Sequence, residues 1–242
     1  MAKASFQGGA RKPSTAPEDM QPKVSQTVGA YLRLKAMIIS GEIDPADQID
    51  ANSLVDVLDF GRTPIREALL RLQTEGIVKI VPKRGVQIVK LSADDLTAIY
   101  QVISAVEIEA VRLLTMQRPS VDQLGKLVGA AERMIMAAET DQREAWILSD
   151  EAFHRGLLAL NPNKRLRDVG LLHRDLAQRA HFVAIRLLQP DCLLKSAKQH
   201  RKLIDLIAGG GVDQAVADHR AQRHRGAKML VDVLRQYRLS QL

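Results

Sequence analysis

Apolar side chains recur every three or four positions along most of this sequence, which is the spacing of one buried face of an α-helix. In the first third of the chain, this spacing predicts helices over residues 24–40, 51–58 and 62–75. Asp50 offers a side-chain acceptor as the N-cap of the second helix, and Gly76 closes the third. We therefore expect three short helices, followed by a segment with a different pattern of residues.

Two runs of β-prone residues follow the third predicted helix, at 77–81 and 86–89. The segment between them, Pro82-Lys83-Arg84-Gly85, has the composition of a turn, so the two runs are expected to pair as a hairpin. Three helices followed by a hairpin is the order of elements in a winged helix-turn-helix. The pattern therefore predicts a small domain of this type over residues 24–91.

No strand pattern follows this domain, and Ser92 with Asp95 three positions later approximates a capped helix start. Prolines and the run Gly209-Gly210-Gly211 mark breaks between the later helices. The expected fold class is therefore mainly α, with an N-terminal winged helix-turn-helix, its small β-hairpin, and a C-terminal all-α helical bundle over residues 92–242. The helices predicted for this bundle lie near residues 92–117, 120–138, 141–159, 164–187, 191–208 and 212–239.

Composition agrees with two largely helical domains in 242 residues, because 46% of the residues are hydrophobic and only 3% are aromatic. Residues 1–23 show no hydrophobic periodicity, so we expect a disordered tail there. The single cysteine, Cys192, excludes an internal disulfide and a CxxC metal site. No apolar run approaches the ~20 residues of a membrane span, and the N-terminus lacks the apolar core of a secretion signal. We therefore expect a soluble, cytoplasmic protein with no membrane partner.

Positive charge is concentrated in the third predicted helix and the hairpin. The whole sequence has a formal net charge of +7, and residues 62–90 alone hold seven Lys or Arg against two Glu. Such a concentration favours a polyanionic partner. On a helix, Arg62 and Arg66 share one face, while Ile65 and Leu69 point the other way. A guanidinium near the start of a helix can bind guanine O6 and N7 in the major groove, or clamp a phosphate.

From Arg62 to Leu69 the sequence reads RTPIREAL, which closely resembles the recognition helix of the GntR family of bacterial transcription regulators. The stretch 39–45 and the wing tip at 83–85 resemble the same family. Gly61 departs from the family's usual Ser or Thr, so we expect Thr63 to cap the helix instead. The resemblance implies that the partner is double-stranded operator DNA, which a homodimer reads as a pseudo-palindrome.

Residues of the second helix, the third helix and the hairpin are expected to contact DNA. Thr63 can donate to a phosphate or contact a thymine methyl, and Arg84 beside the slim Gly85 can enter the minor groove. The family resemblance adds a base or phosphate contact at Asn52. The predicted DNA-contacting residues are Asn52, Arg62, Thr63, Arg66, Arg84 and Gly85.

A second set of positions stands out in the second half of the chain: Glu107, Ala110, Leu113, Leu114, the segment Asp150-Glu151-Ala152-Phe153-His154, and Asn161. These residues more loosely resemble the effector domain of the FadR subfamily, the fatty-acid-responsive branch of the GntR family. This resemblance implies that residues 92–242 bind a small organic acid effector and dimerise. Arg174 and Arg179 are candidates to hold that effector.

A metal site is predicted in the same domain. Asp150 and His154 are four residues apart, so their side chains share one helical face and can meet one cation. The resemblance supplies two more histidines, which match His200 and, after a two-residue insertion in the glycine run, His224. His219 competes for the last position, and five residues along a helix put it roughly 140° away. Three imidazoles and one carboxylate suit a divalent ion such as Zn, Ni or Mn.

These features predict a DNA-binding transcriptional regulator rather than an enzyme, most simply a homodimeric repressor that its effector releases from the operator. Three alternatives stay open: an activator of the same fold, a structural DNA-binding protein without effector, and a metal-dependent hydrolase with a DNA-targeting arm. A hydrolase needs a general base beside the metal-bound water. Glu151 is a poor candidate, because it points about 100° away from Asp150 on the helix.

Overall fold

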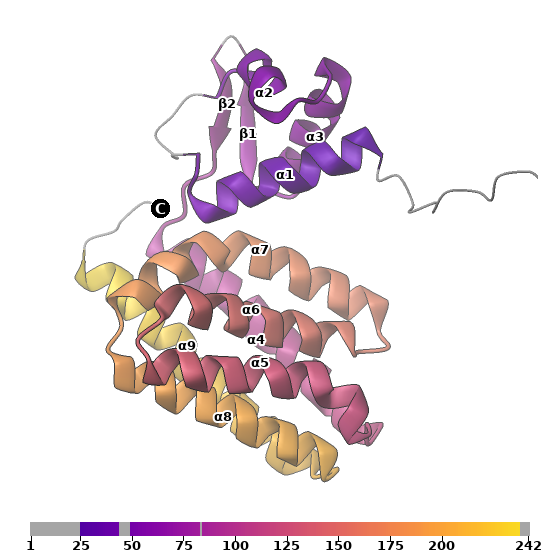
Figure 1. Ribbon diagram of the computed structural model, residues 1–242, viewed down its shortest axis with the longest axis vertical. Coiled ribbons are helices and arrows are strands. Elements are labelled where there is room, and N and C mark those ends of the chain that lie inside the picture. The colour runs from indigo at the N-terminus through magenta and orange to yellow at the C-terminus, as the bar shows by residue number, and fades with distance from the viewer. Residues whose placement is uncertain (1–24, 44–48, 83, 238–242) are drawn as a thin grey trace, which may run out of the picture.

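The computed structural model describes residues 25–43, 49–82 and 84–237, and the tail predicted at 1–23 lies outside them. Within these ranges the chain forms nine helices and one two-stranded antiparallel sheet. Figure 1 shows a small N-terminal body, which holds the hairpin, standing against one side of a larger stack of helices. The predicted fold class, a winged helix-turn-helix followed by an all-α bundle, is confirmed.

Three helices open the first domain, and two of them begin with a side-chain cap. Ser25 and Asp50 each accept a backbone N–H from the first turn that follows. The third helix has Gly61 at the N-cap position with no side-chain hydrogen bond. The expectation that Thr63 caps this helix was therefore wrong, because the helix already includes Arg62 before it. The bounds are α1 (Gln26–Ser40), α2 (Ala51–Leu58) and α3 (Arg62–Thr74).

The hairpin consists of β1 (Val78–Val81) and β2 (Gly85–Ile88), paired in antiparallel register with Val81 opposite Gly85. Ile49 adds an isolated bridge to Val86, with the Ile49 N–H donating to the Val86 carbonyl at 2.9 Å. Gly85 has φ +81°, and a Cβ there would lie 2.7 Å from the Ile49 carbonyl oxygen. The start of β2 therefore needs glycine for both its backbone conformation and its close approach to residue 49.

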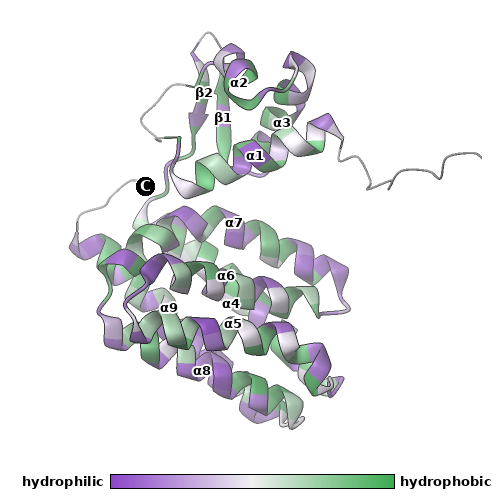
Figure 2. Cartoon of the chain, in the orientation of Figure 1, coloured by the Kyte–Doolittle hydropathy of each residue, from purple (hydrophilic) through white to green (hydrophobic). Residues whose placement is uncertain are grey.

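Apolar faces of the three helices and the hairpin meet in one core, in which Leu34 of α1 and Leu72 of α3 are fully buried. Figure 2 shows hydrophobic and hydrophilic residues alternating along the helices of both domains, as the helical period requires. The amphipathic pattern read from the sequence is thus the pattern that packs the domain.

Six helices form the second domain, and their apolar faces enclose a second, larger core. The predicted helix start at Ser92 is confirmed as a capping box, in which Asp95 and Ser92 bond to each other's backbone N–H. Among the described residues, no helix has the length and apolar character that crossing a membrane requires. The bounds are α4 (Ala93–Met116), α5 (Val121–Glu139), α6 (Arg143–Ala159), α7 (Lys164–Leu187), α8 (Pro190–Ala208) and α9 (Val212–Gln236).

Helix α7 is the element of the second domain on which the first domain rests. Figure 1 shows α1 lying alongside α7, and the two helices contact each other. Leu176 of α7 packs against the core of the first domain. The next residue, Ala177, points about 100° away and belongs to the core of the second domain. One helix therefore contributes to both hydrophobic cores.

Candidate functional site

The predicted DNA-contacting side chains lie on one part of the first domain. Ile65 and Leu69 of α3 are buried, which turns Arg62, Thr63 and Arg66 to the surface, where all three are exposed. This separation of faces follows directly from the helical period.

The remaining predicted contacts flank this helix. Asn52 is exposed in the first turn of α2, and its side-chain amide donates to Asp50 Oδ1 at 3.3 Å. Arg84 is exposed at the hairpin turn, next to the half-buried Gly85. Two arginines at the start of a helix, with a third on a hairpin, form a surface suited to a polyanion.

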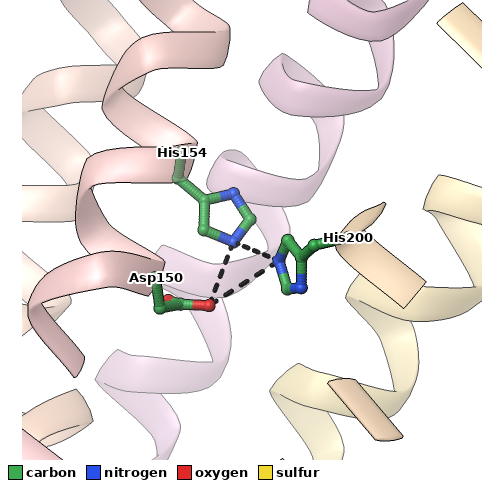
Figure 3. Close-up of side chains that lie close together, drawn as sticks. All are labelled: Asp150, His154 and His200. Atoms are coloured by element: carbon green, nitrogen blue, oxygen red, sulfur yellow. Dashed lines mark hydrogen bonds and ion pairs between the residues drawn. The ribbon is translucent and has the colours of Figure 1, made fainter. Parts of the chain in front are cut away.

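A second cluster of functional groups lies inside the helical bundle. Asp150 and His154 project from successive turns of α6, and His200 meets them from α8, as Figure 3 shows. The Nε2 atoms of His154 and His200 are 3.2 Å apart, and each is 3.6 Å from Asp150 Oδ1. All three residues are buried, and one potential ligand atom from each lies within 4.8 Å of the others.

The ring of His200 is oriented by its own helix. Its Nδ1 lies 2.8 Å from the Ser196 carbonyl oxygen, which can only accept, so this nitrogen carries the proton and Nε2 presents a lone pair to the cluster. Burial lowers the pKa of His200 to about 3, so the imidazole is neutral near pH 7. Phe153 packs edge-on against it with ring centroids 4.6 Å apart.

The ring of His154 is oriented by a buried carboxylate on another helix. Its Nδ1 lies 2.9 Å from Glu107 Oε2 of α4, which turns Nε2 toward Asp150 and His200. Burial by itself raises the pKa of Glu107, but Arg223, His154 and Arg174 outweigh that effect and hold it well below its ordinary value. Glu107 is therefore an ionised acceptor, although it is fully buried.

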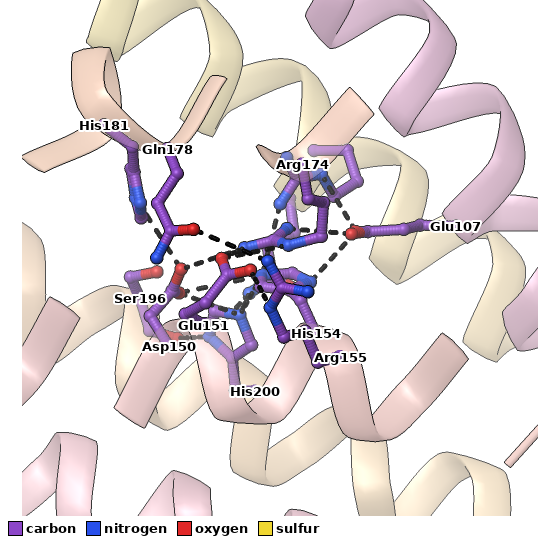
Figure 4. Close-up of polar contacts among 12 residues, drawn as sticks. Glu107, Asp150, Glu151, His154, Arg155, Arg174, Gln178, His181, Ser196 and His200 are labelled. Carbon is purple, nitrogen blue, oxygen red and sulfur yellow. Dashed lines mark hydrogen bonds and ion pairs between the residues drawn. The ribbon is translucent and has the colours of Figure 1, made fainter. Parts of the chain in front are cut away.

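Arg174 of α7 also contacts Glu107, through the carboxylate oxygen that His154 leaves open, as Figure 4 shows. Its Nη1 lies 2.9 Å from Glu107 Oε1, and its Nη2 lies 2.6 Å from Glu151 Oε2. Arg174 was predicted as an effector contact. The structure places it in the wall of the cavity, but its charge is already paired with two carboxylates of the protein.

Two residues predicted to hold the effector or the metal lie away from the buried cluster in the structure. Arg179 lines a recess between α7 and the first domain, beside Ile38 and Gly76, rather than the cavity around Asp150. His224 is exposed and lines an outer groove between α4 and α9. Its assignment to the buried cluster was wrong, because α9 begins directly after the glycine run, and in that register another face of the helix points inward.

His219 is the histidine of α9 that points inward, and it is fully buried. Its Nε2 lies 3.6 Å from Glu107 Oε2, and its ring centroid is 6.4 Å from that of His154. It therefore lies behind His154 rather than beside Asp150.

Gln222 of α9 also contacts His200, and its side-chain amide nitrogen lies 3.0 Å from His200 Nδ1 and 3.3 Å from His200 Nε2. A glutamine on an amphipathic helix has no spacing that marks it in a sequence, so sequence reasoning missed it.

A small cavity of about 50 Å³ adjoins the cluster. Its wall includes Tyr100, Trp146 and His181, together with the Asp150 cluster and Arg174. The indole nitrogen of Trp146 is buried and has no hydrogen-bond partner among the described residues. His181 Nε2 lies 3.6 Å from Asp150 Oδ2. The cavity thus combines an apolar wall with several polar groups that converge on one carboxylate, and its volume lies far below the roughly 300–1,000 Å³ of a pocket for a drug-sized ligand.

Comparison with protein families identifies both domains. Residues 26–88 match the model of bacterial regulatory proteins of the gntR family, and residues 98–224 match the model of the FCD domain. The chain belongs to the GntR family of bacterial regulators. The resemblance read from RTPIREAL and from the Asp150–His154 segment is therefore confirmed for both domains, and this GntR protein is a DNA-binding transcriptional regulator.

Individual relatives agree with this assignment. A helix-turn-helix regulator of Agrobacterium vitis, from the ttuE-ttuC′ intergenic region, is 33% identical over 143 residues, which cover 58% of this chain and 84% of the relative. The transcriptional repressor GlaR of Escherichia coli is 26% identical over 182 residues, covering 73% and 83%. The structure of McbR/YncC from Escherichia coli matches 88% of this chain and 99% of its own with a TM-score of 0.75 at 19% identity, which shows a shared fold.

Proposed function

We propose that this GntR regulator is a homodimeric repressor whose FCD domain binds a divalent cation through Asp150, His154 and His200. In this proposal a small organic acid binds in the adjoining cavity and releases the protein from its operator. The observation that carries the proposal is the buried cluster of three convergent donors at the wall of a cavity. The similarity to the transcriptional repressor GlaR of Escherichia coli supports repression rather than activation.

The donor set fits a divalent transition metal. His200 is neutral, so its Nε2 would offer a lone pair to the cation, and Glu107 orients the His154 ring so that its Nε2 would do the same. Asp150 is fully buried, which raises its pKa, but His154, His181 and His200 outweigh burial and keep it an anion. Two imidazoles and a carboxylate suit Zn, Ni or Mn, and three protein ligands leave positions open. A bound divalent cation would supply a positive charge that attracts an organic anion.

The class of effector follows from the charges in the cavity wall. Arg174 is the arginine that was expected to hold an anion, but Glu107 and Glu151 already neutralise it. Arg223, which also lines the cavity, lies 3.4 Å from the same Glu107 carboxylate. In this proposal, attraction for a carboxylate therefore comes mainly from the cation and from neutral donors such as the Trp146 indole N–H. We infer that the organic acid binds only to the metal-loaded protein.

The DNA-binding mode is proposed from the exposed residues of the first domain. Arg62 and Arg66 would enter the major groove at the start of α3, while Arg84 at the hairpin turn would reach the neighbouring minor groove. Thr63 and Asn52 would contact phosphate or base edges beside them. Because one recognition helix covers one half-site, two copies of the chain would read an operator with two-fold symmetry.

Enzymatic chemistry is disfavoured by the state of Glu151, the carboxylate next to Asp150. Its Oε2 pairs with Arg174 and its Oε1 lies 2.6 Å from Arg155. Although burial opposes ionisation, these two arginines lower its pKa. A carboxylate held in two ion pairs is a weak base, so the alternative of a metal-dependent hydrolase is not adopted.

The double substitution Arg62→Ala and Arg66→Ala tests the proposed DNA contacts. Each specific arginine–base contact contributes about 1–3 kcal/mol of discrimination, so the double variant should lose at least ~10-fold in preference for specific over random DNA. The probe is a duplex selected by the wild-type protein from a random pool, followed by fluorescence anisotropy at fixed salt. Arg112→Ala, which removes an exposed arginine of α4, is the matched control and should bind normally. Full preference in the double variant would contradict the proposal.

A further inference from the structure

A continuous series of ion pairs leads from the cavity wall to the end of the recognition helix. It starts with Arg174 in the wall, whose Nη2 lies 2.6 Å from Glu151 Oε2. Glu151 Oε1 in turn lies 2.6 Å from Arg155 Nε, one turn further along α6. Arg155 then pairs through its Nη2 with Asp175 of α7. These contacts bring the series to the surface of α7 that faces the first domain.

The series continues across the domain boundary. Asp175 Oδ2 lies 2.5 Å from Lys35 Nζ of α1, and the same Nζ lies 2.7 Å from Glu75 Oε2. Glu75 is the C-cap residue of α3, the helix that carries Arg62 and Arg66 at its other end. We call these six residues the ion-pair series: Arg174, Glu151, Arg155, Asp175, Lys35 and Glu75.

Positive and negative groups alternate along the series, and each inner member is shared between two partners of opposite charge. The side chains of Asp175 and Lys35 are both 11% exposed, so water screens the contact between the domains poorly. Removing one partner from such a buried pair leaves an uncompensated charge that must find a new arrangement. Displacement at one end of the series therefore perturbs the next pair.

The geometry of α7 makes it suited to carry such a displacement. Arg174 faces the cavity, the neighbouring Asp175 faces Lys35, and Leu176 packs against the core of the first domain. These three consecutive residues join the ligand site to the DNA-binding domain through one rigid helix.

The far end of the series is also firmly held. Tyr31 of α1 donates its hydroxyl to Glu75 at 2.8 Å, and the Arg71 guanidinium of α3 lies 3.7 Å from the Tyr31 ring centroid. Because these contacts tie the C-terminal end of α3 to α1, a shift of Lys35 relative to α7 would move α1 and α3 together, and with them Arg62 and Arg66.

We propose that the ion-pair series transmits the state of the cavity to the recognition helix, with Arg155 and Asp175 as its positioning residues. Neither residue would touch metal, effector or DNA. The inference rests on the proposed function, in which the cavity is the sensing site. It adds the physical route by which that site alters DNA affinity.

A double-mutant cycle on DNA affinity tests the route without metal or effector. Glu151→Gln breaks the series at the cavity end, and Asp175→Asn breaks it at the domain boundary. Glu151→Gln should change the dissociation constant for the selected duplex by a factor on the order of 5 to 150, the usual range for coupled sites. In a protein that already carries Asp175→Asn, the same substitution should have no further effect.

Matched variants separate transmission from general damage. Asp168→Asn removes an exposed carboxylate of α7 that pairs with Lys164, and it should leave the cycle unchanged. If Asp175→Asn alone fails to fold by circular dichroism, the double substitution Lys35→Met and Asp175→Leu replaces the ion pair with an apolar contact and takes the place of Asp175→Asn in the cycle. Unchanged affinity in Glu151→Gln, or two effects that simply multiply, would overturn the inference. A wild-type protein that binds no divalent ion would instead count against the proposed function, since the cycle contains no metal.

Discussion

Glu107 shows how much a single buried residue can determine in this protein. It is fully buried, yet His154 Nδ1, Arg174 and the Arg223 Nε at 3.4 Å surround its carboxylate. Its ionised form fixes which nitrogen of His154 faces the cluster. A carboxylate that orients a ligating imidazole is a common partner in metal sites.

Glu107→Gln should therefore weaken metal binding while leaving all three proposed ligands in place. The amide can no longer accept with full negative charge from His154, and we expect a loss of about 10- to 100-fold in affinity for Zn²⁺. Competition with a chromophoric chelator measures this affinity. Glu109→Gln on the same helix, where the glutamate forms a solvent-exposed pair with Arg112, is the control and should bind Zn²⁺ normally. Equal affinities in both variants would refute this role of Glu107.

Individual residues also mark the limit of what the sequence could predict about the site. The four-residue spacing of Asp150 and His154 follows from helical geometry, so it could be read directly. The choice between His219 and His224 depended on the register of α9 after three glycines, where a shift of one residue rotates the helix by about 100°. Gln222 and the pairing of Arg174 depend on contacts between helices, which no local pattern encodes.

At the scale of elements, amphipathic spacing and turn residues predicted most of the fold. Every helix of the bundle begins and ends close to its expected position, because prolines, glycines and caps mark the boundaries. The bridge between Ile49 and Val86 could not be read in the same way, since it joins segments on either side of two helices. That bridge explains why the hairpin turn needs Gly85.

Gly85→Ala should destabilise the first domain by more than a backbone penalty alone. Both Gly85, at φ +81°, and Gly41, at φ +78°, have left-handed backbone conformations, but only at Gly85 would a Cβ meet a backbone oxygen. Gly41→Ala therefore isolates the cost of the conformation, roughly 1 kcal/mol. We expect Gly85→Ala to lower the free energy of unfolding by at least about 1 kcal/mol more. Urea denaturation of the two variants measures the difference, and equal losses would show that the contact with Ile49 is unimportant.

At the scale of the whole molecule, the proposed metal should contribute to global stability. A ligand at 100 times its dissociation constant stabilises the folded state by ~2.7 kcal/mol. For a protein of this size, EDTA should then lower the unfolding midpoint by roughly 5–10 °C. Calorimetry with and without EDTA measures the change. Asp150→Asn should abolish the response and Asp168→Asn should retain it, whereas identical responses in the two variants would exclude a site at Asp150.

The position of Trp146 provides the whole molecule with an intrinsic fluorescent probe. It is the single tryptophan of the chain, and it lies in the cavity wall with its indole nitrogen unpaired. Tryptophan fluorescence from the native, unlabelled protein therefore originates next to the proposed sensing site. A library of organic acids can be screened by fluorescence titration alone, with no dye and no knowledge of the genes under control.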